Sequence, residues 1–344
     1  MTKIKDVARE ANVSIATVSR ILSSDHTLSV SEDTRKRVWQ TADLLNYKPR
    51  KKKSAKKLKM NQDNAYNIGI ISALAQEDEV HDPYFLSIRL GLEIACEQLP
   101  LNIKNIFRLE KGISLEELHN LDGLIVIGGV DLKSLRDIYY ENENVVLVNH
   151  LPREGNYDVV ASDLERAIEV VLNHLTKLNH YNIGYLGGLD NIKSVDSGRV
   201  IKEIEDARKV SYEKLMRQKG LYNPENVFIG EWGPSGGYEL MKQAIEKGNL
   251  PSAMVIASDP MAIGALRALY EEGINVPEDI SLISFDDIEA AEFLNPPLST
   301  VKIHAEEMGK MAAKLLWDRL NGRNISTRVV LDTELIIRKS CQAK

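Results

Sequence analysis

The sequence predicts an α/β protein with a small helical head, a basic linker and a larger body built on parallel β-sheets. Three observations support this fold class. Residues 4–46 show helical periodicity only, residues 49–64 are polar and cationic, and from Ile68 onward β-rich runs alternate with helical segments. A chain of 344 residues is long enough for two or three domains. We place the domain boundaries at 1–48 for the head, 49–65 for the linker and 66–344 for the body.

Three short helices are expected in the head. They are IKDVAREA (4–11), IATVSRILS (15–23) and SEDTRKRVWQTADLLN (31–46), each with apolar residues at helical spacing. Ser14 and Ser31 stand directly before the second and third segments, where helix N-caps belong. Only three or four residues separate the first two helices, which is the connection of a helix-turn-helix.

The second helix presents an outer surface of small, uncharged side chains and one long cation. This surface consists of Ser14, Ile15, Ala16, Thr17, Ser19 and Arg20. In a helix-turn-helix the second helix enters the major groove of DNA, where small side chains permit close approach. We expect Arg20 to donate two hydrogen bonds to a guanine, and Ile15 and Ala16 to make apolar contacts with bases. Ser14 and Thr17 are expected to hold phosphates. The alternative is a structural three-helix cap that never meets DNA.

Charge is distributed unevenly along the chain. Residues 1–60 carry 15 Lys and Arg against 6 Asp and Glu, a net charge of +9, whereas the remainder carries 29 against 44, a net charge of −15. A basic head on an acidic body indicates a nucleic-acid-binding module joined to another unit. A basic terminus that is merely solvated is the alternative.

The body shows the alternation typical of parallel α/β sheets. The runs IGIISA, GLIVIG, VVLVN, NIGYLGG, SAMVIAS and ISLISF are short and β-rich, and most precede a helical pattern. Such alternation specifies right-handed crossovers. There are too many strands for one compact sheet, so we expect two lobes with ligand-facing loops at the carboxyl ends of the strands.

Residues suited to a neutral polyol occur at strand ends and helix starts of the body. A carboxylate accepts hydrogen bonds from adjacent hydroxyl groups, and an arginine donates in a fixed fork. Asp286 ends the run ISLISFD and is the candidate acceptor, and Arg208 in EDARKVSY is the candidate donor. A turn-capping role for Asp286 and a surface ion pair for Arg208 are the structural alternatives.

Several classes of protein are disfavoured by what the sequence lacks. No Gly-rich phosphate loop, nucleophile elbow or Ser-His-Asp order is present, so we expect neither catalytic residues nor a cofactor, although an enzyme remains a rival use of the body. The seven histidines show no metal-ligand spacing. Cys96 and Cys341 are interpreted as two free thiols in a reducing compartment. No signal peptide or membrane-spanning run is recognised, which favours a cytoplasmic protein over a transport-type binding protein.

The sequence also resembles a known family. IKDVAREANVSIATVSRIL and LLNYKP resemble the N-terminal signature of the lactose/galactose repressor family of bacterial transcription regulators. NHLTKLNHYNIGYLGG and SDPMAIGALRALYEEGINVPEDISLISFDDIEAAEFLNPPLSTV resemble that family's effector-binding body, in order and spacing. The resemblance covers nearly the whole chain. It implies a two-lobed body with the fold of periplasmic sugar-binding proteins.

The resemblance assigns roles to several positions. Ile15 and Ala16 stand where family members vary to choose their operator, and the pair is closer to galactose-type members than to lactose-type ones. Arg20 stands where a base-contacting arginine is usual. In the body, the sequence DPYF (82–85) matches the loop at the cleft mouth. The positions matching family effector-binding residues are Asn149, Arg208, Trp232, Ser258 and Asp286, with Ser258 replacing a frequent Asn.

Three positions depart from the family pattern. Lys3 occupies the place of the Thr that usually caps the first helix, so that Thr2 substitutes or the helix frays. Asn179 replaces the Gly that normally ends a body helix, and Asn tolerates the left-handed conformation required there. In the linker, AKKL (55–58) lies two residues farther along than the family's hinge run, which puts the insertion of Leu58 into the minor groove in question.

An electrostatic role is the other interpretation of the linker. The sequence KKKSAKKLK can follow DNA phosphates without a wedge, unless it is merely a solvated run of charge. The linker residues assigned to DNA binding are Lys51, Lys52, Lys53, Lys56, Lys57 and Leu58.

The sequence as a whole predicts a DNA-binding transcriptional repressor with a small-sugar effector, galactose or a related sugar. The effector is expected to favour one placement of the two lobes and thereby to change the spacing of two heads in a homodimer. No heptad tail follows ELIIRKS, so a dimer is expected rather than a tail-made tetramer. A regulator of the same fold that uses a phosphocarrier protein as co-repressor is the alternative, as is a sugar-binding protein without a transcriptional role.

Overall fold

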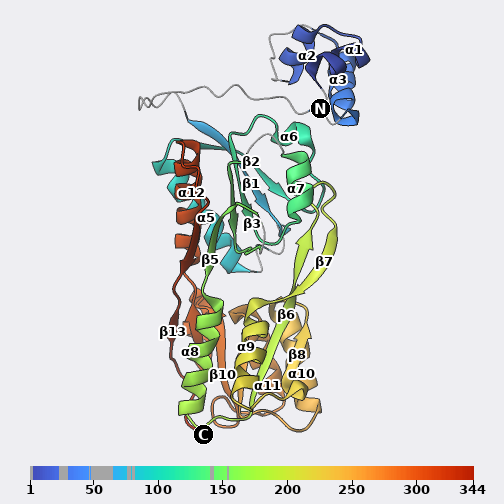
Figure 1. Ribbon diagram of the computed structural model, residues 1–344. Coiled ribbons are helices and arrows are strands. Elements are labelled where there is room, and N and C mark those ends of the chain that lie inside the picture. The colour runs from blue at the N-terminus through green and yellow to red at the C-terminus, as the bar shows by residue number, and fades with distance from the viewer. Residues whose placement is uncertain are drawn as a thin grey trace.

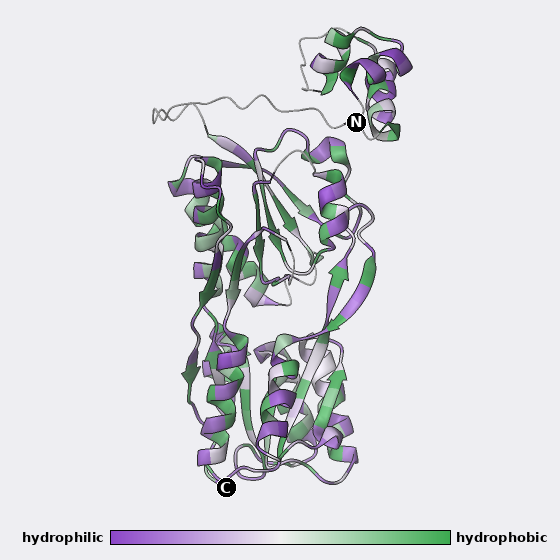
Figure 2. Ribbon diagram, viewed as in Figure 1, coloured by the Kyte–Doolittle hydropathy of each residue, from purple (hydrophilic) through white to green (hydrophobic). Residues whose placement is uncertain are grey.

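The computed structural model of the protein consists of a helical head and a body of two stacked lobes (Figure 1). It describes residues 3–22, 30–45, 47, 65–75, 79, 82–139, 143–152 and 155–344. Hydrophobic residues concentrate in the strands of both lobes, and hydrophilic residues concentrate on the outer faces of the helices (Figure 2). The expected fold class is therefore confirmed, with a parallel sheet in the first lobe and a mainly parallel sheet in the second.

The head contains the three expected helices, α1 (Ile4–Glu10), α2 (Ile15–Leu22) and α3 (Glu32–Leu44). They enclose one small hydrophobic cluster, which includes Val7, Val18, Ile21 and Val38. Asn12 ends α1 in the left-handed conformation, with φ of 52°, and this permits the tight turn into α2.

Local hydrogen bonds begin each helix of the head. The hydroxyl oxygen of Ser14 accepts from the backbone N–H of Thr17 at 3.0 Å, and that of Ser31 accepts from the backbone N–H of Thr34 at 3.3 Å. Both expected N-caps are confirmed. In α1 the carboxylate of Asp6 accepts from the backbone N–H of Lys3 at 2.9 Å. Asp6 thus satisfies one backbone donor at the start of α1 without the usual Thr.

The first lobe is built on a six-stranded parallel sheet with the order β12-β5-β4-β3-β1-β2. Helices α5 and α12 pack against each other on one side, and α6 and α7 lie on the other (Figure 1). The strands are β1 (Tyr66–Ser72), β2 (Leu101–Arg108), β3 (Gly123–Ile127), β4 (Val145–Val148), β5 (Asp158–Ser162) and β12 (Arg328–Leu331). The helices are α5 (Pro83–Gln98), α6 (Leu115–Leu118), α7 (Leu132–Ile138) and α12 (Ala305–Leu320).

The second lobe is built on a seven-stranded sheet with the order β13-β11-β10-β9-β6-β7, in which β8 also pairs with β6. Strands β7 and β13 are antiparallel to their neighbours, and the other pairs are parallel. The strands are β6 (Ile183–Lys193), β7 (Val200–Glu205), β8 (Val227–Gly230), β9 (Ala253–Ile256), β10 (Ser281–Asp286), β11 (Ser299–Lys302) and β13 (Glu334–Ile336). The helices are α8 (Leu164–Lys177), α9 (Ala207–Gln218), α10 (Gly233–Glu246) and α11 (Asp259–Glu271), with short 3-10 turns at Pro224–Asn226 and Glu289–Phe293.

The chain passes between the lobes three times within the described body. The crossings join β5 to α8, β11 to α12 and β12 to β13. Such short connections allow the lobes to rotate about a hinge.

Just beyond α8, Asn179 has φ of 67°, so the left-handed conformation expected at this position is confirmed. Cys96 and Cys341 are unbonded thiols.

Candidate functional site

The outer surface of α2 is exposed while its inner face is buried. Val18, Ile21 and Leu22 are almost fully buried, whereas the side chain of Ile15 is 51% exposed. Ser14, Ala16, Ser19 and Arg20 are also exposed, and Thr17 is half-buried. An isoleucine held this far into solvent contributes nothing to the head's core. It is available for an apolar contact with a partner.

The amino end of α2 favours an anion. The helix contains no acidic residue, and its first backbone N–H groups carry the positive end of the helix dipole. The hydroxyl groups of Ser14 and Thr17 hydrogen-bond to each other at 2.8 Å in the same first turn. This arrangement suits a phosphate at the helix start and base edges along the exposed surface. The linker residues assigned to DNA binding, Lys51 to Leu58, lie outside the described residues.

Arg208 is the centre of a polar cluster in the second lobe. Its guanidinium donates to both carboxylate oxygens of Asp206 at 2.8 Å and to the carbonyl of Ala257 at 2.5 Å. Its side chain is only 12% exposed. Burial would lower the pKa of Arg208, but the carboxylate of Asp206 outweighs that effect and raises it, so the charge is retained. Asp206 also caps α9 by accepting from the backbone N–H of Arg208 at 2.8 Å.

Three further carboxylates interact electrostatically with Arg208, and they come from both lobes. Asp286 ends β10 and Asp190 lies in β6, whereas Asp82 begins α5 in the first lobe. Burial raises the pKa of Asp286, and the negative charge of Asp259 raises it further, while Arg208 opposes both. Burial, together with the charge of Asp206, raises the pKa of Asp190 to about 6. Burial also raises the pKa of Asp82. These carboxylates therefore lie around Arg208 at the junction of the lobes, and its positive charge lowers the pKa of each one against the effect of burial.

Asp259 fixes the backbone around Asp286. Its buried carboxylate accepts from the hydroxyl groups of Ser284 and Thr300 and from the backbone N–H of Ile288 at 2.9 Å. Asp286 itself has φ of 110°, in the left-handed region that non-glycine residues rarely adopt. The hydrogen bonds of Asp259 hold this strained segment in place. They keep Asp286 oriented toward the junction of the lobes.

Two of the other predicted residues lie near this cluster. Asn149 follows β4 in the first lobe with φ of 56°, and its side-chain oxygen accepts from the hydroxyl group of Tyr84 at 3.0 Å. The hydroxyl group of Tyr84 also feels the charge of Asp286 across the junction, and burial together with that charge raises the pKa of Tyr84. Trp232 lies 5.2 Å from the guanidinium carbon of Arg208, measured to its ring centroid, and its indole N–H donates to the carbonyl of Leu189 at 2.8 Å.

Ser258 has a structural task. Its side chain is 6% exposed, and its hydroxyl oxygen accepts from the backbone N–H of Met261 at 3.4 Å, at the start of α11. Ser258 stands directly between Ala257, whose carbonyl accepts from Arg208, and Asp259, which holds the segment around Asp286, and its contact with an effector stays a prediction. Sequence reasoning missed Asp190 and Asp206. Asp206 lies two residues before Arg208, and its position as the N-cap of α9 was the signal that could have found it. Asp190 comes near Arg208 only through the pairing of β6 with β7.

The chemistry of the junction is recognition of hydrogen-bond donors. Asp82, Asp190 and Asp286 are acceptors when ionised, and the guanidinium of Arg208 offers donors in a fixed fork. A ligand with several adjacent hydroxyl groups fits this set, and an anionic ligand does not, because Asp206 already pairs with Arg208. Within the described residues no group of three His, Cys, Asp or Glu is arranged to hold a metal ion.

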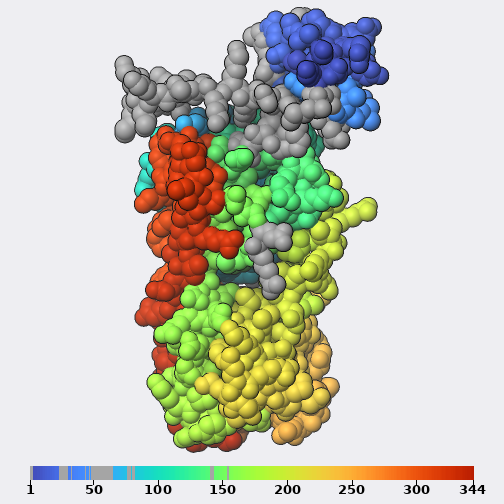
Figure 3. Space-filling view, viewed as in Figure 1, coloured from blue at the N-terminus to red at the C-terminus, as the bar shows by residue number. Residues whose placement is uncertain are grey.

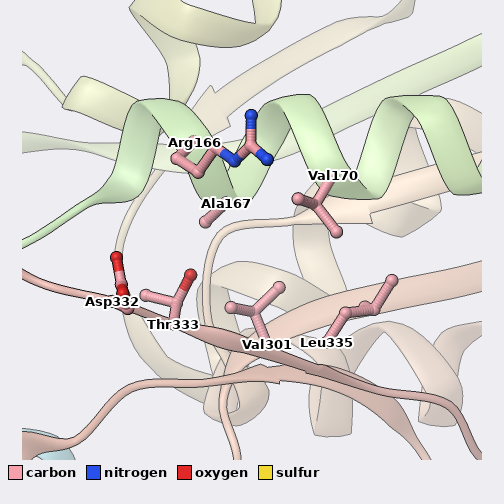
Figure 4. Close-up of a pocket in the computed structure, with 7 residues that line it drawn as sticks. All are labelled: Arg166, Ala167, Val170, Val301, Asp332, Thr333 and Leu335. Carbon is pink, nitrogen blue, oxygen red and sulfur yellow. The ribbon is translucent and has the colours of Figure 1, made fainter.

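A separate pocket of about 360 Å³ lies between α8 and the β11 and β13 strands (Figure 4). It is lined by Arg166, Ala167, Val170, Val301, Asp332, Thr333 and Leu335. The guanidinium of Arg166 already pairs with Glu169 at 3.0 Å. None of the predicted effector residues lines this pocket. Asn149, Trp232 and Asp286 lie instead around the junction at Arg208.

Comparisons with known proteins agree on both parts of the chain. Residues 3–50 match the model for bacterial regulatory proteins of the lacI family, and residues 172–341 match the model for the periplasmic binding protein-like domain. The chain is 43% identical over 343 residues to the HTH-type transcriptional repressor MelR of Bacillus subtilis (strain 168), covering 99% of this chain and 98% of the relative. It is 37% identical over 343 residues to the HTH-type transcriptional regulator GalR of Lacticaseibacillus casei, covering 99% of each.

Solved structures show the same architecture. The transcriptional regulator CelR in complex with cellobiose has a TM-score of 0.69 and 24% identity, covering 99% of this chain and 100% of that one. The lac repressor dimer bound to operator and the anti-inducer ONPF has a TM-score of 0.68 and 22% identity, covering 99% of each chain. At these identities the likeness concerns the fold alone.

In the described part of the chain, no helix has the length and apolar character needed to span a membrane.

Proposed function

We propose, on the premise that the chain belongs to the lacI family of bacterial regulatory proteins, that a small neutral sugar controls its release from an operator. As a member of this family the protein is a DNA-binding transcription regulator and not an enzyme. The observation that carries this proposal is the junction at Arg208, where, among the residues that the structure describes, carboxylates from both lobes surround one guanidinium. A sugar bound there contacts Asp82 in one lobe and Asp286 in the other, so it favours one placement of the lobes.

The regulated unit is proposed to be a homodimer in the cytoplasm that represses a sugar-utilisation operon. Two heads, each comprising residues 1–48, would read two half-sites of one operator. The linker at 49–65 would set their spacing, and the body at 66–344 would bind the effector and the partner subunit. A coupling free energy of about 1–3 kcal/mol between sugar and operator is ordinary for such a switch. Galactose or a related sugar is the first candidate, since Ile15 and Ala16 resemble the galactose-type members of the family.

A thermal-shift screen tests the effector. Galactose, cellobiose, ribose and their phosphorylated forms are added singly to the full chain, and Tm is measured, because a ligand that binds only the folded state raises it. We expect a neutral sugar to raise Tm and its phosphorylated form to have no effect. A stabilising phosphosugar would contradict the proposal. Binding of a phosphocarrier protein, with no response to any sugar, would support the co-repressor alternative instead.

Substituting Arg20 by Ala should reduce sequence-specific binding. Loss of two hydrogen bonds to a guanine costs about 1–3 kcal/mol, so affinity for the selected operator falls by about 5- to 150-fold. The measurement is fluorescence anisotropy with a duplex selected from a random library, compared with a scrambled duplex. Affinity for the scrambled duplex should change little. Equal losses on both duplexes would show that Arg20 contacts only the phosphates.

Replacing the linker lysines by Gln should reduce the salt dependence of operator binding. Each lysine that no longer neutralises a phosphate lowers the slope of log K against log salt concentration by about one unit. The variant changes Lys51, Lys52 and Lys53, and a Leu58→Ala variant tests the minor-groove wedge separately. An unchanged slope in the lysine variant would contradict the electrostatic role.

A further inference from the structure

The hairpin formed by β6 and β7 leaves the second lobe and reaches the first. The first half of β6 is buried in the second-lobe sheet. Its second half pairs with β7, from Leu189 opposite Glu205 to Lys193 opposite Val200, and Lys193 also bridges to Val130 of the first lobe. The hairpin runs along one edge of the molecule between the two lobes (Figures 1 and 3). We refer to its tip, residues 193–199, as the strap.

A single apolar side chain anchors the strap. Val195 is fully buried, and it belongs to the hydrophobic cluster of the first lobe together with Ile113, Leu118 and Leu135. Full burial of a valine side chain contributes about 1.5–3 kcal/mol. In contrast, Val200 on the same hairpin is 48% exposed. The hairpin is thus held at its tip and has little packing along β7.

Hydrogen bonds attach the strap to two connections of the first lobe. The backbone of Lys193 donates to the carbonyl of Gly129 at 3.1 Å and accepts from the backbone N–H of Asp131 at 2.8 Å. The carbonyl of Val195 accepts from the backbone N–H of Ile113 at 2.9 Å, and its N–H donates to the hydroxyl group of Ser134 at 2.9 Å. These bonds replace water at groups that would otherwise be buried without partners.

The first lobe provides two glycines where the hairpin approaches most closely, one at the strap and one at β6. A Cβ atom added at Gly112 would lie 1.7 Å from the carbonyl oxygen of Asp196, and one added at Gly129 would lie 2.5 Å from that of Asn191. Any side chain at Gly112 would therefore exclude the docked backbone. The surface of the first lobe at these two glycines therefore accommodates the backbone of this hairpin.

The other end of the hairpin is part of the effector junction. Asp190 lies in β6 three residues before the strap and interacts electrostatically with Arg208. Asp206 follows β7 directly and binds the guanidinium of Arg208. The carbonyl of Leu189 holds the indole of Trp232. The base of the hairpin thus lies at the cluster around Arg208, and its tip lies in the first lobe.

We propose that the strap is a fourth, non-covalent link between the lobes, which transmits effector binding at Arg208 to the first lobe. Three covalent crossings permit the lobes to rotate, but a rigid hairpin docked at its tip forces the 109–113 and 128–134 connections to move with the second lobe. A ligand that shifts Asp190 or Asp206 shifts the strap. This inference rests on the proposed sugar effector, and it identifies the element that carries the response.

The test compares Val195→Ser with Val200→Ser in the full-length protein. The two variants carry the same chemical change in one hairpin, but only the first removes the buried anchor. Hydrogen exchange of residues 189–206, followed by mass spectrometry without ligand, should become faster in Val195→Ser and remain unchanged in Val200→Ser. Gly112→Ala, which blocks docking from the first lobe, should reproduce the faster exchange. It serves as the test if Val195→Ser does not fold.

The second measurement is coupling. Operator affinity is determined with and without saturating galactose, or with the neutral sugar that raises Tm of the wild type. In Val195→Ser the ratio of the two affinities should fall by about tenfold, while sugar affinity measured by calorimetry changes less than about threefold. Two results would overturn the role of the strap. One is a variant with fast hydrogen exchange whose operator affinity still responds fully to the sugar, and the other is a Val195→Ser protein whose exchange stays slow. A wild-type protein whose operator affinity ignores every sugar would instead refute the proposed function, and the exchange data would still report docking.

Discussion

Substituting Asp286 by Ala should abolish the response to the effector while leaving operator binding intact. The carboxylate is held toward the junction by the bonds that Asp259 makes to the same segment. A typical hydrogen bond contributes about 0.5–1.5 kcal/mol. Loss of two such bonds to adjacent sugar hydroxyls therefore weakens binding by about 5- to 150-fold. Asp286 is in the second lobe, far along the chain from the head, so the surface of α2 remains as it is.

The measurement is calorimetric titration with the neutral sugar identified by the thermal shift, alongside operator binding in the presence of that sugar. Asp286→Asn is the conservative variant, because it retains the shape of the side chain and one acceptor. It should bind the sugar with an affinity between those of the wild type and Asp286→Ala. Normal induction by Asp286→Ala would place the effector elsewhere in the body.

The head was predictable because its signals are local. The N-caps at Ser14 and Ser31 and the buried positions Val18, Ile21 and Leu22 all lie within one or two helical turns of the features they determine. Helix periodicity, caps and turn residues agree with one another, and such agreement makes a short sequence specify its fold. The DNA-binding roles of this surface remain predictions, since they depend on a partner outside the chain.

In the body most central strands were predicted, whereas the edge strands and the interior strands β5 (DVVAS) and β11 (STVK) were not. β3 (GLIVI) and β9 (AMVI) are buried throughout and form continuous apolar runs. β2 (LNIKNIFR) and β7 (VIKEIE) lie at sheet edges and alternate with polar residues, so only their pairing over long range identifies them. The strap was missed for the same reason. Nothing near Val195 in the sequence shows that this valine is buried in the other lobe.

The candidate site was predictable only in part. Asp286 stands directly after an apolar strand, where ligand-facing residues of α/β sheets collect, and this signal is visible in the sequence. Asp82 and Asp190 interact with Arg208 because two lobes and a hairpin meet there, which no local pattern encodes. The hydroxyl group of Ser258 caps α11, and its predicted role in ligand binding stays a prediction.

Substituting Asp158 by Ala should greatly destabilise the first lobe. Asp158 is fully buried at the start of β5, and its carboxylate binds Arg319 at 2.8 Å, Arg323 at 2.7 Å and the backbone N–H of Thr327 at 2.7 Å. The truncation leaves Arg319 buried with an unpaired charge, which costs about 3–5 kcal/mol of the free energy of unfolding. Urea denaturation of the full chain measures the loss. Glu165→Ala, which breaks an exposed ion pair with Lys214, is the control and should cost less than about 1 kcal/mol.

The same carboxylate gives the stability a defined pH dependence. Burial alone would raise the pKa of Asp158, but the hydrogen bonds from Arg323, Arg319 and the backbone outweigh burial and lower it. A lowered pKa in the folded state means that this stabilisation is complete above the ordinary carboxyl pKa and is lost as the pH falls through the folded value. The wild type should therefore lose its advantage over Asp158→Asn on acidification. If the difference in the free energy of unfolding between the two proteins stays constant down to strongly acidic pH, Asp158 is not ionised in the folded state. Arg319 and Arg323 would then lack the negative charge that holds β12 against β5.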